Sequence, residues 1–438
     1  MKIVEMRVTP VAMADPPLLS SYGLHAPYAL RTVIELVSED GLVGIAETHG
    51  GEQIHEDFEH ARRTVIGRSA YDLGRLSIDL EALFSQPIAT RDGGLASTQT
   101  FILPGESGED ISMRVFGAVE VAALDLIGKA TGVPVCELLG GRVREEVPFS
   151  AYLFYKRPGG GGAGADARAD TWGEAMDPDS IVRQARQMID GYGFRSIKLK
   201  GGVLPPEQEI EAILALRDAF GPDVPLRIDP NGAWTVETSV QVGMALAGAL
   251  EYLEDPTPGL EGMGAVRRQL LDSDVDMLLA SNNALTSWSD IPPALASGGV
   301  QVILSDHHYW GGLRAVTHLG RLCETLGIGL SMHSNSHLGV SLLAMVHLAA
   351  AVPHLTFASD THYPWQEAGD EILAGGRVQF AGGSVRVPTT PGLGGALDYD
   401  ALARGRERYE RCGYRRRDDQ AEMCRHVDAD WQRLAPRW

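Results

Sequence analysis

Two lysines stand two residues apart in the segment SIKLK, and this spacing suggests acid–base chemistry. The segment is typical of a short buried strand, in which alternate side chains share a face, so Lys198 and Lys200 point the same way. Burial and mutual repulsion would each lower the pKa of these lysines, which is how a lysine becomes a proton acceptor near neutral pH. We therefore predict either a base or an anion-binding pair here. An exposed pair at a frayed strand end is the alternative.

The next three segments of this kind end in oxygen-bearing side chains. Asp229 and Asn231 share a face in RIDPNGAW, and Glu254 and Asn282 end the two segments that follow. Carboxylate and amide oxygens are the ligands that Mg²⁺ prefers. A single carboxylate at such a position would more often be a capping or surface residue. Because the oxygens recur in the same structural position, we predict a magnesium site formed by Asp229, Glu254 and Asn282.

A carboxylate and an imidazole follow on the next two segments. Asp306 ends QVILSD and His333 ends GLSMH, with Asn335 on the same face as His333. A carboxylate within reach of an imidazole orients the ring and makes it more basic. The other histidines that we weighed are interpreted as ordinary core or surface side chains: His307, His308, His347 and His354.

A divalent cation between Lys200 and His333 would suit the removal of a proton α to a carboxylate. The cation stabilises the enediolate, and a base on each side allows either stereochemistry. The second base can also act as a general acid and expel a β-hydroxyl group.

These polar residues recur at a nearly constant distance along the chain. From Lys200 to Asp360 the segments end at intervals of 24 to 29 residues, which is the length of one strand–helix unit. Alternating strands and helices imply a parallel sheet, and the earlier segment VPFSAYLFY brings the number of expected strands to eight. The predicted fold class is α/β, a TIM-type (β/α) barrel with its active site at the carboxyl ends of the strands.

The regions on either side of the barrel have a different pattern. Residues 1–140 begin with alternating strand-like runs and continue with three helical stretches, which predicts an N-terminal α+β capping domain. Residues 141–390 would form the barrel. Residues 391–438 are turn-rich and then charged, and we expect them to pack back on the capping domain or over the barrel mouth.

A glycine-rich stretch within the barrel region imitates a nucleotide-binding motif. PGGGGAGADARAD has the GxGxxG spacing at Gly159, Gly161 and Gly164. A dinucleotide site needs a helix that begins at the last glycine, whereas the next predicted helix begins only at about Asp179. We interpret the stretch as a flexible loop over the barrel mouth.

Composition narrows the classes of partner. The 438 residues include 38 Lys+Arg and 58 Asp+Glu, and a formal charge of −20 disfavours simple electrostatic binding to nucleic acid or an anionic membrane. Four cysteines without a CxxC pair indicate neither a disulfide scaffold nor a zinc site. The opening MKIVEMRVTPV lacks a signal-peptide core, and the longest apolar run is too short to span a bilayer. We expect a cytoplasmic protein whose partner is a small molecule.

Together these motifs resemble those of the enolase superfamily, in its mandelate racemase-like branch and, within it, the glucarate dehydratases. The resemblance covers nearly the whole chain and is carried by SIKLKGGV, RIDPNGAW, YLEDP, ASNNALTSW, LSDHHYW, MHSNSHLGVSL and SDTHYPWQE. It implies an enolase-like barrel with a capping domain, a Mg²⁺ cofactor and a homo-oligomer. The implied reaction is dehydration of D-glucarate, and of L-idarate, to 5-keto-4-deoxy-D-glucarate.

The resemblance also implies residue roles. Lys200 and His333 would be the acid–base catalysts, with Asp306 orienting His333, Lys198 binding the substrate carboxylate and Asn231 assisting at the enediolate. The implied substrate-lining residues are His25, Thr100, Tyr152, Ser334, Asn335, His362 and Arg417. For the middle metal ligand the resemblance leaves two candidates open, Glu254 and Glu261, and Asn283 beside Asn282 is a second ambiguity.

Other functions stay open from the sequence. The same chemistry on another aldarate, such as galactarate, would use the same barrel residues with different N-terminal loops. A racemase or epimerase would use the same Lys/His pair without net loss of water. A non-catalytic barrel would leave the convergent strand ends unexplained, and a metal-dependent hydrolase would normally carry HxH on its first strand, which this sequence lacks.

Overall fold

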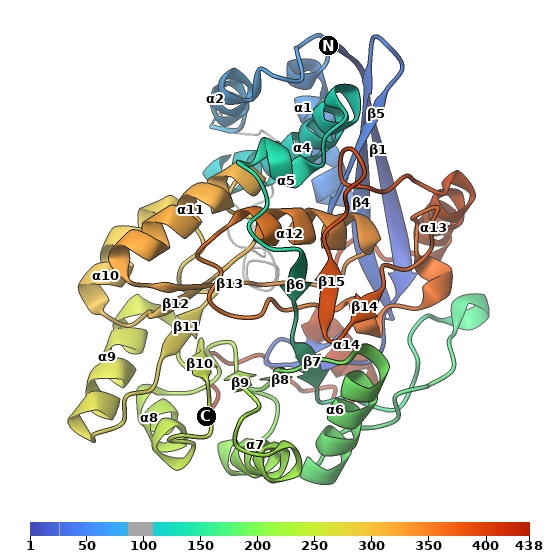
Figure 1. The fold of residues 1–438 in the computed structure, drawn as a ribbon. Helices are drawn as coiled ribbons and strands as arrows, with labels where there is room; N and C mark the ends of the chain where they lie inside the picture. Colours follow the sequence, from blue (N-terminus) through green and yellow to red (C-terminus); the bar gives the residue numbers. More distant parts are fainter. Residues whose placement is uncertain (26, 86–107) are drawn as a thin grey trace.

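The computed structural model describes residues 1–25, 27–85 and 108–438 (Figure 1). Its N-terminal part contains a three-stranded antiparallel sheet in the order β1-β4-β5. The strands are β1 (Ile3–Ala14), β4 (Tyr28–Ser38) and β5 (Val43–His49). These are the strands that the alternating pattern predicted, and the β4–β5 turn contains Gly41 at a φ of 80°, a conformation that favours glycine.

In the described part of the chain, the helices that accompany this sheet are α1 (Glu52–Val65), α2 (Leu73–Phe84) and α4 (Gly108–Thr131). The longest of them, α4, packs against β4, β5 and α2. Ile111 and Val115, one helical turn apart, are both buried and extend its apolar face.

Seven parallel strands form a second, curled sheet whose spatial order from β7 to β13 is the order of the chain (Figure 1). They are β7 (Ala151–Phe154), β8 (Ile197–Lys200), β9 (Leu226–Asp229), β10 (Tyr252–Glu254), β11 (Leu279–Ser281), β12 (Val302–Ser305) and β13 (Gly329–Met332). The accompanying helices are α6 (Pro178–Tyr192), α7 (Pro206–Phe220), α8 (Val236–Ala245), α9 (Gly259–Asp272), α10 (Ile291–Ser297), α11 (Leu313–Leu326) and α12 (Gly339–Ala351). Each predicted strand end from Lys200 to His333 falls at the end of an observed strand or one residue beyond it.

The predicted eighth strand, ending at Asp360, is not a regular strand. Thr356 and Phe357 both donate their backbone N–H groups to the carbonyl of Leu330, so the ladder loses its register at this point. The segment still bonds to both edges of the sheet. Asp360 N donates to Met332 O of β13 at 2.8 Å, and Ser150 N, just before β7, donates to Ser359 O at 2.8 Å.

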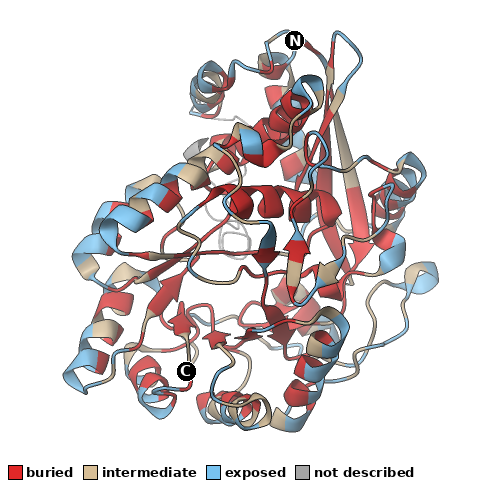
Figure 2. Cartoon of the chain, in the orientation of Figure 1, coloured by how far each residue is buried: buried red, intermediate tan, exposed pale blue. Residues whose placement is uncertain are grey.

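Helix α12 is buried over its whole length (Figure 2). It contacts β5 of the N-terminal sheet, the short helix α5 (Val135–Leu138) and the neighbouring α11. This burial explains the apolar run SLLAMVHLAAA. Within the described ranges, no helix is both long and apolar enough to cross a membrane.

The C-terminal segment returns to the N-terminal part of the chain. Helix α13 (Tyr399–Cys412) packs on β1, and α14 (Asp419–His426) packs on β3 (Gly23–Leu24), which pairs with β2 (Leu19–Ser20). A further small sheet consists of β14 (Phe380–Ala381), β15 (Ser384–Arg386) and β6 (Glu146–Pro148).

The glycine-rich segment is tied down rather than loose, which corrects the expectation of a flexible loop over the barrel mouth. Asp166 forms ion pairs with Arg408 and Arg411 of α13 and accepts a hydrogen bond from the Tyr28 hydroxyl. Lys156 pairs with Asp170 at 2.9 Å. The contacts of Asp166 hold the first half of the segment against the N-terminal and C-terminal elements, and the Lys156–Asp170 pair holds its second half to the residues that follow β7.

Candidate active site

The register of the parallel strands brings the predicted residues side by side. Lys200 is the direct neighbour of Phe154 on one side and of Asp229 on the other. The Lys200 ammonium lies 2.5 Å from Asp229 Oδ2. The first base candidate and the first metal-ligand candidate are therefore in contact.

Lys198 is fully buried beneath this contact. Its Nζ lies 2.7 Å from Glu254 Oε1 and 2.6 Å from Asp360 Oδ2. Burial alone would lower the pKa of Lys198, but Asp360 and Glu254 outweigh it and hold the pKa well above the usual value. The sequence expectation of a lowered pKa is therefore wrong for Lys198. This ammonium group neutralises carboxylates and is not among the residues that line the cavity.

A group of buried carboxylates could hold a cation at the strand ends. Ligand atoms of Asp229, Glu254 and Asp255 all lie within 4.8 Å of one another. With its amide nitrogen turned toward them, Asn282 donates to Glu254 Oε1 at 2.9 Å and to Asp255 Oδ2 at 3.2 Å. With its oxygen turned there instead, Asn282 meets only acceptors, an arrangement that a divalent cation would satisfy.

Glu261, the other candidate for the middle ligand, is exposed in the first turn of α9. It lies outside the acidic group found among the described residues. The geometry therefore favours Glu254 over Glu261.

Asn231 is presented to the cavity by an unusual backbone. Its φ is +49°, a left-handed conformation that asparagine tolerates better than most residues. Its backbone N–H and its side-chain amide both donate to Asp229 Oδ1, at 3.0 and 2.9 Å. These bonds fix the orientation of the Asp229 carboxylate and of the Asn231 side chain together.

Asp306 and His333 form the predicted pair. His333 Nδ1 lies 3.0 Å from Asp306 Oδ2. Burial would raise the pKa of Asp306, but His308 and His333 beside it bring the pKa well below its usual range. His308, which the sequence analysis treated as an ordinary histidine, also bonds to Asp306, with Nδ1 2.7 Å from Oδ1.

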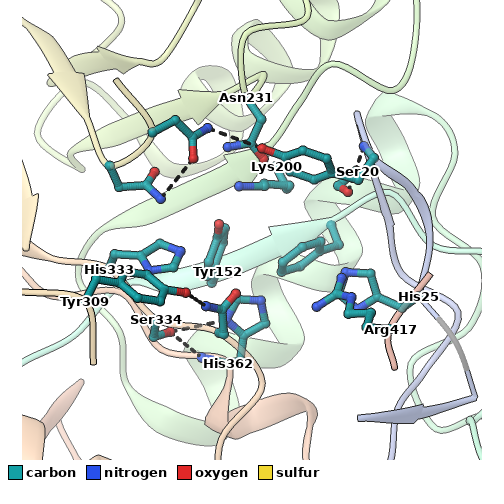
Figure 3. A pocket seen from close by; sticks show the side chains of 15 residues that line it. Ser20, His25, Tyr152, Lys200, Asn231, Tyr309, His333, Ser334, His362 and Arg417 are labelled. Carbon is teal, nitrogen blue, oxygen red and sulfur yellow. Dashed lines mark hydrogen bonds between the residues drawn. The ribbon is translucent and has the colours of Figure 1, made fainter. Parts of the chain in front are cut away.

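One cavity collects most of the predicted residues (Figure 3). Lys200 and Asn231 lie on one side of it, His333 and His362 lie on the other, and His25 and Arg417 lie toward one end. The predicted site residues among its lining are His25, Tyr152, Lys200, Asn231, Asn282, His333, Ser334, Asn335, His362 and Arg417. The predicted Thr100 lies outside the described residues.

Hydrogen bonds hold several of these side chains in place. Asn335 Nδ2 donates to Tyr309 Oη at 2.7 Å and to His49 Nε2 at 2.9 Å, which leaves its carbonyl oxygen for a ligand. Burial holds the pKa of His49 well below its usual value, so His49 stays an acceptor. Arg417 pairs with Asp419 through two hydrogen bonds of 2.7 and 2.6 Å.

The cavity also contains residues that sequence reasoning missed, namely Ser20, Tyr22, Phe154, Asn283 and Tyr309. Phe154 could have been found, because it lies two residues after Tyr152 and shares its face of the strand. Asn283 was noted only as a neighbour of Asn282. Ser20 and Tyr22 lie in the short β2–β3 hairpin, for which the local sequence gives no functional signal.

A curled sheet of successive parallel strands, with acids, bases and oxygen ligands at one edge, is the arrangement expected of an enolase-like enzyme fold. A family model described as "Enolase C-terminal domain-like" matches residues 180–401. The chain is 44% identical to a probable glucarate dehydratase of Streptomyces coelicolor, over 100% of this chain and 99% of that one. It belongs to the enolase superfamily.

Two solved structures support this assignment. An enolase from Thermobispora bispora, solved with magnesium and formate, is 51% identical, covers 100% of both chains and superposes with a TM-score of 0.92. One from Pseudomonas fluorescens, solved with magnesium, potassium and tartrate, is 44% identical with a TM-score of 0.93, covering 100% of this chain and 99% of that one.

The burial of Lys198 predicts a large stability effect. Lys198→Met would leave Glu254 and Asp360 buried without their cation, and we expect the free energy of unfolding to fall by about 3–5 kcal/mol. Urea denaturation in the presence of a chelator measures this change. Lys2→Met, at an exposed lysine, is the control and should change stability little. Equal stability of the two variants would contradict the role given to Lys198.

Proposed function

We propose that the protein catalyses the Mg²⁺-dependent dehydration of D-glucarate, and of L-idarate, to 5-keto-4-deoxy-D-glucarate. The observation that carries the proposal is that Lys200 and His333 line one cavity from different sides, next to the group of Asp229, Glu254 and Asn282. Two bases on different sides of one substrate suit proton removal from either epimer at C5.

His333 is the base for D-glucarate. His333 Nδ1–H donates a hydrogen bond to Asp306, which leaves Nε2 without a proton and free to take the C5 proton. The proton then passes from His333 to the departing hydroxyl group at C4, and the resulting enol tautomerises to the keto product. Lys200 takes the C5 proton of L-idarate in the same way.

The residues at the strand ends fit a magnesium ion. Asp229, Glu254 and Asn282 would hold it through hard oxygen ligands, and the orientation of Asn282 toward acceptors supports this assignment. When bound, Mg²⁺ supplies positive charge beside the substrate carboxylate and lowers the energy of the enediolate. Asn231, whose orientation Asp229 fixes, lines the same cavity and would assist at the enediolate.

Polar residues around the cavity suit a six-carbon diacid. Arg417 and His25 at one end would bind the distal carboxylate, while Ser334, Asn335 and His362 would bind hydroxyl groups. Thr100 is proposed to contribute as the family resemblance implies. Lys198, which lies below the cavity, would act by neutralising Glu254 and Asp360 and not by binding the substrate carboxylate. The same resemblance supports a closed barrel over residues 141–390, a capping domain over 1–140 and a homo-oligomeric assembly.

Proton NMR in D₂O with Mg²⁺ tests the proposed reaction. D-glucarate, L-idarate and galactarate are offered separately to the purified protein. We expect a deoxy-keto acid from the first two and none from galactarate. Deuterium exchange without loss of water would contradict the proposal and indicate an epimerase. Dehydration of galactarate alone would show that the substrate is another aldarate.

Metal-binding measurements separate the two candidate ligands. Glu254→Gln should weaken Mg²⁺ binding by more than about 100-fold, because it removes a charged ligand, while outer-shell changes alone reach 10–100-fold. Glu261→Gln is the matched control and should bind Mg²⁺ as the wild-type protein does. Isothermal titration calorimetry gives both affinities. A loss confined to Glu261→Gln would reverse the assignment.

A further inference from the structure

Asp306 accepts hydrogen bonds from two histidines rather than one. Oδ2 faces His333 Nδ1 at 3.0 Å, while Oδ1 faces His308 Nδ1 at 2.7 Å and the His308 backbone N–H at 2.9 Å. The carboxylate and both rings are buried. An ionised carboxylate can only accept, so each of the two Nδ1 atoms must carry a proton.

The second nitrogen of His308 also faces an acceptor. His308 Nε2 lies 3.1 Å from the backbone carbonyl oxygen of Glu47 in β5. A carbonyl oxygen cannot donate, so a proton on Nε2 is needed for this bond as well. The Ser341 hydroxyl, at 3.3 Å, could donate to a bare Nε2, but it lies farther away than the carbonyl.

We propose that His308 is held as a doubly protonated imidazolium that neutralises Asp306, and that it thereby keeps His333 a weaker base than an isolated Asp–His pair would give. His308 is a positioning residue here, because it acts on His333 only through Asp306. The inference rests on the proposed function of His333 as the base for D-glucarate.

The charge balance gives the direction of the effect. With His308 charged, the His308–Asp306 pair carries no net charge. Protonation of His333 is then not favoured by a neighbouring negative charge. Without the charge on His308, Asp306 presents a full negative charge to His333, which favours the protonated form of the ring. His308 therefore keeps His333 unprotonated, and ready to accept a proton, at lower pH.

The other charges around His308 belong to compensated pairs. On the N-terminal side Arg31 pairs with Glu47 at 2.7 Å, and Arg114 pairs with Asp57 at 3.2 Å. The neighbouring histidines are His49, His307 and His337, and burial lowers the pKa of each, which keeps them neutral.

On the cavity side, the groups facing His333 are Tyr309, with ring centroids 6.2 Å apart, then His362 and, across the cavity, Lys200. Burial keeps His362 neutral by lowering its pKa, and Lys200 is paired with Asp229. Among the groups around His308 and His333 in the described part of the chain, His308 is the one proposed cation that bonds to Asp306, the carboxylate that also bonds to His333.

The pH dependence of kcat/KM tests the inference. In His308→Asn the amide can still donate to Asp306 but carries no charge. We expect the acidic limb of the D-glucarate profile to move to higher pH by about one unit, which is about a tenfold loss of kcat/KM on that limb. Activity on the plateau should persist.

His307→Asn is the matched control. Its ring lies 3.9 Å from that of His308, and its Nδ1 is 4.0 Å from Asp306 Oδ1, but it is neutral. Its acidic limb should stay at the wild-type position. An unmoved limb in His308→Asn, or equal movement in both variants, would overturn the inference.

A second measurement on the wild-type protein does not need activity or a folded variant. NMR of the ¹⁵N-histidine-labelled protein distinguishes doubly protonated rings from neutral ones. We expect one buried ring to be doubly protonated, with protons on both Nδ1 and Nε2 and with slow exchange of the Nε2 proton. A spectrum in which every buried ring is neutral overturns the inference, whereas absence of turnover with this ring present overturns only the proposed reaction.

Discussion

The ammonium group of Lys198 is the contact that allows several carboxylates to meet at one edge of the parallel sheet. It lies between Glu254, at the end of β10, and Asp360, in the irregular segment that joins the two sheet edges. Burying two such acids without a cation would cost several kcal/mol for each ion. Lys200 does the same for Asp229 one pleat further along β8. Lys198 and Lys200 share one face of the strand, and their two-residue offset along it places Lys198 below the cavity and Lys200 inside it.

The N-terminal sheet contributes to the site through a small number of buried polar contacts. Glu47 of β5 accepts hydrogen bonds from the backbone N–H groups of Leu338 and Ser341, at 2.8 and 2.9 Å, and so caps the start of α12. The residues just before this helix include His333 and Asn335. Two residues further along β5, His49 accepts from Asn335. The edge of the parallel sheet that carries the cavity and the N-terminal sheet thus share hydrogen bonds that fix the same loop.

The sequence predicted the strand ends well because two strong regularities act there. A parallel sheet needs a strand about every 27 residues, and the two-residue period of a strand separates inward from outward side chains, so Lys200, Asp229 and His333 were found together. Ser20 and Tyr22 could not be placed, because they reach the cavity from a hairpin that only tertiary packing positions.

Two other expectations failed and one open alternative is disfavoured, for related physical reasons. The segment ending at Asp360 keeps its place between the sheet edges but loses regular pairing, which a hydrophobic pattern does not reveal. Glu261 has the right residue type near the right loop, yet the start of α9 turns it to solvent. His308 bonds to Asp306, which lies two residues earlier in the chain, and so joins the Asp306–His333 pair. This contact is formed in a local turn, which the periodic patterns of strands and helices do not predict.

Isotope exchange at C5, measured on two epimers with two variants, tests the central claim that Lys200 and His333 act on different sides of one substrate. Lys200→Arg keeps the positive charge next to Asp229 but accepts a proton poorly, and His333→Asn keeps a donor to Asp306. In D₂O with Mg²⁺, we expect His333→Asn to lose exchange on D-glucarate and to retain it on L-idarate. We expect Lys200→Arg to lose exchange on L-idarate and to retain it on D-glucarate. Loss of exchange on the same epimer in both variants would contradict the arrangement of the two bases.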